Sequence, residues 1–127
     1  MPGVKDWLKK ASSDLKASQK LSDDDETLDC SVFHTHQCAE KAFKAFIVSL
    51  QQTIPKTHDL RFLLELCARV DSEFMLLLEE SKNLNSYGHD ARYPNDYFHV
   101  DKQKAEEAAE MAAKILIAIK QKLAVQI

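Results

Sequence analysis

The 127-residue sequence has little glycine and proline, with two glycines and three prolines. Because these residues mark most turns, their scarcity argues against an all-β domain with many short strands. Hydrophobic residues make up 45% of the chain, and a chain of this length can bury one core. The sequence therefore predicts one all-α domain that spans residues 1–127.

The sequence also lacks an excess of basic residues and a paired set of cysteines. A formal net charge of -3 argues against a protein that coats nucleic acid, although it allows a small phosphate site. Cys30, Cys38 and Cys67 are odd in number and form no CxxC motif. A disulfide framework and a zinc ribbon are therefore not indicated, and the reducing cytoplasm fits this cysteine content.

Long apolar segments are missing as well. Residues 1–15 contain no apolar stretch of the kind found in a secretory signal, and the run AFIVSLQQTIP is too short and too polar to span a bilayer. We therefore expect a cytoplasmic protein that does not contact the membrane.

Apolar residues recur at spacings of three and four in several segments, which is typical of amphipathic helices. This pattern predicts helices at about residues 4–20 and 29–51, with Asp25 or Thr27 as cap of the second. Thr57 is the expected cap of a third helix, and Ser72 is expected to begin a fourth that ends before Gly88. Asp101 is the expected cap of a long, alanine-rich last helix.

The inward side chains of these helices can be predicted from the same spacing. The expected inward residues of the second to fifth helices are Val32, His36, Ala39, Phe43, Phe46, Leu50, Leu60, Leu63, Leu64, Cys67, Phe74, Met75, Leu77, Leu78, Leu84, Ala105, Ala108, Ala109, Ala112, Ile115, Leu116, Ile119 and Leu123.

The segment HTHQC at residues 34–38 looks like a metal-ligand cluster. On a helix, however, His34 and Cys38 share a face while His36 points away, so the three cannot bind one ion. We expect no metal and no cofactor, and we interpret His36 as a hydrogen-bonded core residue. Glu40 and Lys44 are spaced for a surface ion pair.

The segment YGHDARYPNDYFHV, residues 87–100, differs from its surroundings because it holds all three tyrosines. A connection of this length between helices is often functional. Arg92 is suited to grip a phosphate through two parallel hydrogen bonds, and His99 can exchange a proton at cellular pH. The alternative is that Arg92 only pins the segment through carboxylate or carbonyl bonds while His99 packs near the last helix.

Three segments, QCAEKAFKAF, PKTHDLRFLL and HDARYP, follow one another in an order and spacing that resemble the HEPN domain, the nucleotide-binding domain of higher eukaryotes and prokaryotes. The resemblance covers nearly the whole chain. It implies an up-and-down bundle of four or five helices that forms a homodimer, with the arginine-containing segments of both subunits lining a shared cleft.

Many HEPN proteins are ribonucleases that use an arginine followed, after four to six residues, by a histidine. Arg92 and His99, with six residues between them, match that spacing and are the expected catalytic pair. Arg92, Tyr93, Tyr97 and His89 are the expected contacts to nucleotide phosphate. Because Pro94 would cost about 3 kcal/mol inside a helix, we do not expect Arg92 and His99 to share one continuous helix.

The resemblance also implies a partner, because small prokaryotic HEPN proteins are often encoded beside a minimal nucleotidyltransferase as toxin and antitoxin. Three functions stay open: a nucleotide- or RNA-binding protein that acts as a metal-independent endoribonuclease, a non-catalytic module that binds the nucleotidyltransferase, or a helical dimer that serves only as a scaffold. The sequence leaves open whether the protein is an enzyme and whether His36, His58 or His89 assists in its function.

Overall fold

The computed structural model describes residues 2–94 and 98–126, with side chains up to residue 124. Five α-helices form the domain: α1 (Val4–Leu21), α2 (Leu28–Ser49), α3 (Leu60–Ala68), α4 (Leu78–Asn85) and α5 (Lys102–Gln126). The described residues contain no strand, which confirms the predicted all-α class.

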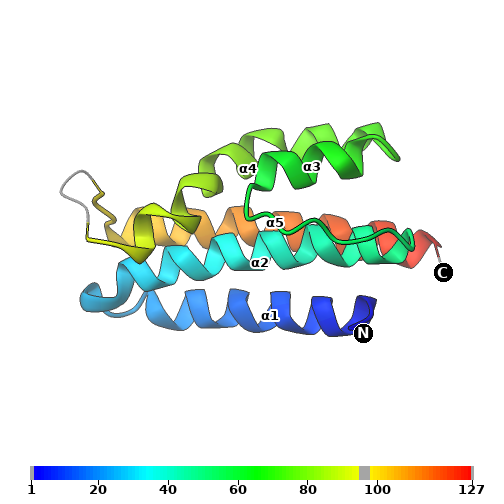
Figure 1. Ribbon diagram of the computed structural model, residues 1–127. Helices are drawn as coiled ribbons and strands as arrows, with labels where there is room; N and C mark the ends of the chain where they lie inside the picture. Colours follow the sequence, from blue (N-terminus) through cyan, green and yellow to red (C-terminus); the bar gives the residue numbers. More distant parts are fainter. Residues whose placement is uncertain (1, 95–97, 127) are drawn as a thin grey trace.

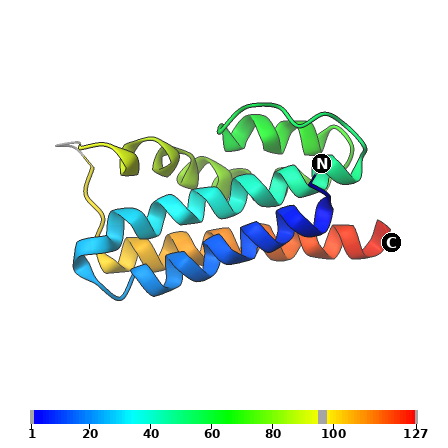
Figure 2. The same ribbon diagram turned by 60° about the horizontal axis from the view of Figure 1, so that its bottom comes forward.

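The helices are arranged around α2. In Figures 1 and 2, α1, α2 and α5 lie side by side, while α3 and α4 cover them from one side. The two ends of the chain lie at one end of this bundle, and the connector between α4 and α5 lies at the opposite end (Figure 1). The central position of α2 lets one helix contact segments from most of the chain.

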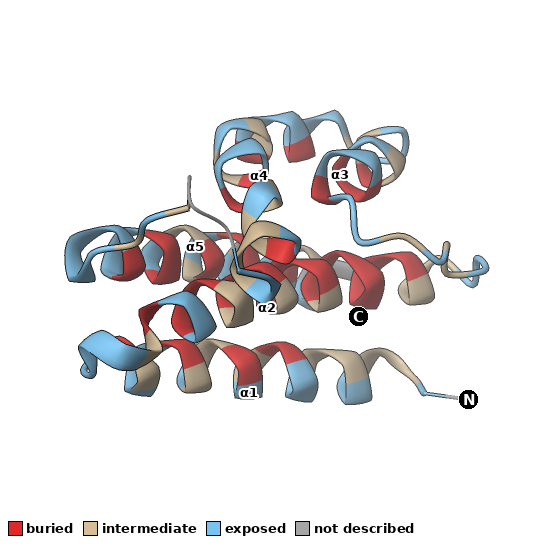
Figure 3. Ribbon diagram, turned by 60° about the vertical axis from the view of Figure 1, so that its left-hand side comes forward, coloured by how far each residue is buried: buried red, intermediate tan, exposed pale blue. Residues whose placement is uncertain are grey.

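The core follows from the apolar faces of these helices. On α2, Val32, Ala39, Phe43 and Phe46 are all fully buried. The predicted inward face of α5 is buried as well; its members are Ala105, Ala108, Ala109, Ala112, Ile115, Leu116, Ile119 and Leu123. Figure 3 shows these buried residues facing between the helices, while the outer faces of α1, α3 and α4 are exposed.

Two helix starts differ from the sequence-based predictions. Asp59, rather than Thr57, caps α3, because its Oδ1 accepts hydrogen bonds from the backbone N–H groups of Arg61 and Phe62. Thr27 precedes α2 but makes no cap, since its hydroxyl donates to the carbonyl of Leu21 instead. The prediction for α5 is confirmed, because Asp101 Oδ1 accepts from the Lys104 N–H at 2.7 Å.

The expected fourth helix is split in two. Residues Ser72–Leu77 form a 3₁₀ segment, η2, and the α-helix α4 begins only at Leu78. The tighter winding of η2 turns Phe74 and Leu77 inward and leaves Met75 44% exposed, so the inward placement of Met75 was wrong. Gly88 is buried in a separate 3₁₀ turn, η3 (Ser86–Gly88), rather than lying just past an α-helix end.

None of the described helices combines the length and the apolar character that crossing a bilayer requires.

The first prediction concerns the aromatic contact that joins η2 to α2. The ring of Phe74 lies 4.6 Å from that of Phe46 and 6.4 Å from that of Phe43, and all three are fully buried. We expect Phe46→Ala to lower the free energy of unfolding by about 3–5 kcal/mol, because it leaves a cavity that the core cannot fill. Urea unfolding measures this loss, and a change below about 1 kcal/mol would contradict the described core.

Candidate functional site

One face of α2 collects contacts from two other parts of the chain. Phe33, His36, Gln37 and Glu40 lie at spacings of three and four along α2 and therefore share this face, which we call the His36 face. The residues that meet it come from the segment before α3 and from the connector before α5. The His36 face thus brings together residues that are far apart in the sequence.

His36 is the most buried polar residue of this face. Its Nε2 donates a hydrogen bond to the backbone carbonyl of His58 at 2.8 Å, and its Nδ1 accepts one from the Gln37 side chain at 3.2 Å. Both ring nitrogens are satisfied when the ring is neutral. The prediction of a hydrogen-bonded core histidine is therefore confirmed.

Gly88 lies directly on the His36 ring. A Cβ atom added at Gly88 would come within 2.5 Å of two ring atoms of His36, so only glycine fits this contact. Hydrogen bonds from the backbone N–H of His89 to the Ser86 carbonyl, and of Arg92 to the His89 carbonyl, continue this contact into the turn η4 (Asp90–Arg92). His36 therefore sets the position of the turn that carries Arg92.

Arg92 is exposed and stacks on aromatic rings. Its guanidinium carbon lies 5.5 Å from the ring centre of Phe33 on α2 and 5.9 Å from that of Tyr93. Within residues 2–94 and 98–124, no carboxylate forms an ion pair with Arg92. Stacking orients the planar group while its N–H donors stay available for an anion.

The other predicted phosphate contacts lie around Arg92 where they are described. The rings of His89 and Tyr93 are 5.2 Å apart, and His89 Nδ1 lies 3.3 Å from the Asp90 carboxylate. Tyr93 is more than half exposed. Tyr97 lies outside the described residues, so its predicted contact stays a prediction.

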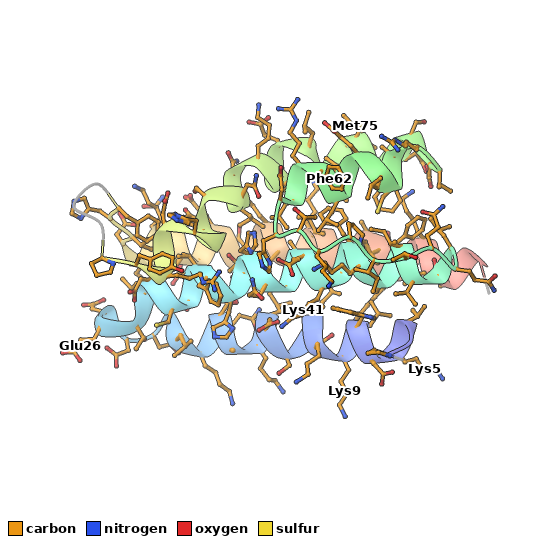
Figure 4. The ribbon with its side chains drawn as sticks, in the orientation of Figure 1. Lys5, Lys9, Glu26, Lys41, Phe62 and Met75 are labelled. Atoms are coloured by element: carbon orange, nitrogen blue, oxygen red, sulfur yellow. The ribbon has the colours of Figure 1, made fainter. Side chains whose placement is uncertain are left out.

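His99 and Tyr93 line one depression of about 370 Å³ between the start of α2 and the connector, to which the Arg92 side chain does not contribute. Four carboxylates line it as well, those of Asp25, Glu26, Asp29 and Asp90. Figure 4 shows Glu26 at this end of the bundle. Among the described residues, no hydrogen bond or ring contact joins His99 to Arg92.

Pro94 has the predicted effect on the backbone. The turn η4 ends at Arg92, and α5 begins only at Lys102. Arg92 and His99 therefore do not share a continuous helix, and the depression around His99 is acidic rather than basic.

Glu40, Lys44 and His58 form a cluster that the sequence did not reveal. Glu40 accepts hydrogen bonds from Lys44 Nζ at 2.9 Å and from His58 Nδ1 at 2.8 Å. The predicted Glu40–Lys44 pair exists, but it is buried rather than on the surface, with side-chain exposures of 5% and 9%. The His58 side chain is 69% exposed. The feature of the sequence that could have indicated this cluster is a glutamate at an inward position of α2.

A second polar cluster holds α1 against α2 and is structural. Asp14 accepts hydrogen bonds from His34 Nδ1 at 2.8 Å and from Lys41 Nζ. Lys41 is labelled in Figure 4, where α1 and α2 face each other. In the part of the chain that the structure describes, no three His, Cys, Asp or Glu side chains are grouped to hold a metal ion.

Comparisons with known proteins agree with this architecture. The HEPN domain model matches residues 4–122. The crystal structure of TT1696 from Thermus thermophilus is 26% identical, with a TM-score of 0.79 over 96% of this chain and 99% of that one. ST0689, an archaeal HEPN homologue, is 25% identical, with a TM-score of 0.75 over 96% and 98% of the two chains. A search of curated proteins gave no significant match.

The second prediction concerns the effect of pH on the contact made by His36. Burial is the largest cause that lowers the pKa of His36, and the charges of His58 and Arg92 add to it, while the hydrogen bond to the His58 carbonyl and the Glu40 charge act in the opposite direction. A lowered pKa means that the unfolded chain binds the proton more readily. The contribution of His36 to the free energy of unfolding is therefore fully present above about pH 6.5, the pKa of an unfolded histidine, and it falls as the pH drops below this value.

Denaturant unfolding between pH 7.5 and 5 measures this dependence in the wild type and in His36→Asn. We expect the wild type to lose more stability over this range than the variant, because asparagine does not titrate. Equal slopes for the two proteins would show that His36 carries none of the pH dependence.

Proposed function

Because the chain belongs to the HEPN domain family, we propose that it is a dimeric, cytoplasmic nucleotide- or RNA-binding protein that holds a phosphate at Arg92. The observation that carries the proposal is the state of Arg92: exposed, stacked on Phe33 and Tyr93, and without an ion pair to any described carboxylate. A guanidinium held in this way offers parallel N–H donors to a phosphate without first leaving another partner.

Aromatic rings beside Arg92 support binding of a nucleotide rather than of phosphate alone. Tyr93 is exposed next to the guanidinium, and its ring can stack on a base while the arginine holds the phosphate. His89, against the Tyr93 ring, is a second donor on the same side. The net charge of -3 fits one local contact rather than an extended basic track.

The finer proposal is that the dimer cleaves RNA without a metal and acts as the toxin of a minimal nucleotidyltransferase. Here Arg92 would stabilise the charge that develops on the phosphate, and His99 is the proton-transfer residue that the family spacing suggests. A shared cleft between two subunits would let Arg92 and His99 act together, even though η4 ends at Arg92 and the two residues share no helix.

The third prediction tests the role of Arg92 with a fluorescein-labelled single-stranded RNA of mixed sequence. We expect Arg92→Ala to weaken binding about ten- to hundredfold, because charged hydrogen bonds are worth about 1.5–3 kcal/mol. Arg92→Lys should give an intermediate affinity, since it keeps the charge but not the planar donors. Fluorescence anisotropy measures both, and sedimentation of the same samples tests for twice the 14.5 kDa chain mass.

Arg69→Ala is the matched control, because Arg69 is an exposed arginine at the end of α3. Equal weakening by Arg69→Ala and Arg92→Ala would contradict a local site. Cleavage of the same RNA in EDTA, compared between wild type and His99→Ala, tests the enzymatic part. If neither protein cleaves it, the ribonuclease proposal fails while RNA binding can stand.

The second candidate function is a non-catalytic module that binds the nucleotidyltransferase. One observation favours it: an apolar groove of about 900 Å³ between η2 and α5, whose wall includes Leu76 and Ile117, 76% and 55% exposed. Along its rim, Lys122 pairs with Asp71 and Glu73, and Lys114 pairs with Glu80. Neutralised charges around exposed apolar side chains suit a protein surface and not a polyanion.

The fourth prediction concerns this groove. We expect Ile117→Glu to abolish co-purification with a co-expressed nucleotidyltransferase encoded beside the gene, because a carboxylate would have to be desolvated in the interface. Gln103→Glu adds the same charge to α5 about 21 Å away and should leave the complex intact. Retention of the complex by Ile117→Glu would rule out the groove, and conversion of a dimer to a monomer would assign it to a second copy.

A further inference from the structure

His58 has an orientation that a passive surface residue does not need. Its Nδ1 lies 2.8 Å from Glu40 Oε1, and Glu40 is buried on α2 with only 5% of its side chain exposed. Because the carboxylate accepts at Nδ1, the proton of a neutral His58 ring is on Nδ1. The Nε2 of His58 is then an unprotonated acceptor on a ring that is 69% exposed.

Lys44 completes this arrangement. Its Nζ lies 2.9 Å from the other oxygen of Glu40, so a full positive charge already balances the buried carboxylate. Lys44 is itself buried and lies 6.0 Å from the centre of the Trp7 ring. Lys44 and His58 thus bind the two oxygens of one buried carboxylate, which holds the imidazole in one direction.

His58 and Arg92 both contact the same face of α2. Arg92 stacks on Phe33 and His58 binds Glu40, and His36 lies between these two positions on α2. Phe33 and Glu40 are seven residues apart, which is about 10.5 Å along the helix axis. Both side chains are exposed, and this spacing suits an RNA strand that contacts them at successive positions rather than at one sugar-phosphate unit.

The local charge also distinguishes His58 from His99. His99 lines a depression with four carboxylates, which repels an RNA backbone. The carboxylate nearest the His58 ring is neutralised by Lys44, and the exposed Lys56 lies two residues away in the sequence. Of the two histidines, His58 is the one that an anionic substrate can approach more easily.

We propose that His58, positioned by the buried Glu40–Lys44 pair, is the general base of the site and acts on a ribose 2′-hydroxyl of an RNA strand that Arg92 holds at another phosphate. The inference rests on the proposed RNA binding at Arg92 and assigns the proton transfer to a residue outside the Arg92–His99 spacing. Glu40 is a positioning residue, since it touches His58 and not the substrate.

The step uses no oxidant or added co-reactant. Nε2 of His58 takes the proton of the 2′-hydroxyl, and the 2′-oxygen forms a bond to phosphorus. The bond between phosphorus and the 5′-oxygen breaks, and the departing 5′-oxygen takes a proton from solvent. The products are a 2′,3′-cyclic phosphate and a 5′-hydroxyl end, and the imidazolium returns its proton to solvent.

The fifth prediction compares His58→Ala, His99→Ala and the wild type in EDTA, with RNA binding and cleavage measured on the same samples. We expect His58→Ala to cleave at least about a hundredfold more slowly, the range lost when a general base is removed, with RNA affinity within about threefold of wild type. The variant should fold, because the backbone carbonyl of His58, and not its ring, holds His36. A loss of rate in His99→Ala beside wild-type cleavage by His58→Ala would assign the proton transfer to His99 instead.

Added imidazole should restore part of the cleavage rate of His58→Ala. Such rescue is not expected if His58 has only a structural role. Wild-type cleavage by His58→Ala, or a loss of binding equal to the loss of rate, would overturn the proposal. RNA binding by the wild type without cleavage would overturn it too and leave Arg92 binding intact. Absence of both binding and cleavage would mean that the proposed function itself fails.

Discussion

The hydrogen bond from His36 Nε2 to the backbone carbonyl of His58 is the contact on which the arrangement of the site depends. It fixes the segment before α3 against α2 and so places the His58 ring beside Glu40. The other side of the same imidazole supports Gly88, and the turn that follows carries Arg92. One buried ring thus positions an exposed imidazole and an exposed guanidinium that are 34 residues apart in the sequence, from 58 to 92.

The surfaces of the bundle differ in charge and polarity. Arg92 and His58 border the His36 face, whereas carboxylates surround His99 and an apolar groove with paired rim charges lies between η2 and α5. The charges of the His36 face favour an anionic ligand, whereas the apolar groove favours contact with a protein. Figure 4 shows Phe62 and Met75 exposed on the α3 and η2 side, away from α1. Nucleotide binding and partner binding can therefore occupy different surfaces of one small bundle.

Residue spacing predicted the long elements well and the short ones less well. The inward faces of α2 and α5 follow from regular spacing over many turns, and so does the burial of His36. The 3₁₀ winding of η2 could not be read from the sequence, because apolar side chains three residues apart, such as Phe74 and Leu77, fit both 3₁₀ and α-helical winding. The contact between Glu40 and His58 joins a helix to a loop 18 residues later, and no periodicity reports such a contact. Arg92 and the connector were found by composition, but the carboxylates around His99 come from another segment and required the fold.

Titration of isotope-labelled protein with a ribonucleoside 3′,5′-bisphosphate, followed by NMR, is the most direct test, because this ligand keeps the 2′-hydroxyl and two phosphates and cannot be cleaved by the proposed step. The account predicts that the largest shifts fall on the His58 imidazole, the Arg92 guanidinium and the Phe33 ring, which lie along one face of α2. Shifts confined to Asp25, Asp29 and His99, or to Leu76 and Ile117, would contradict it.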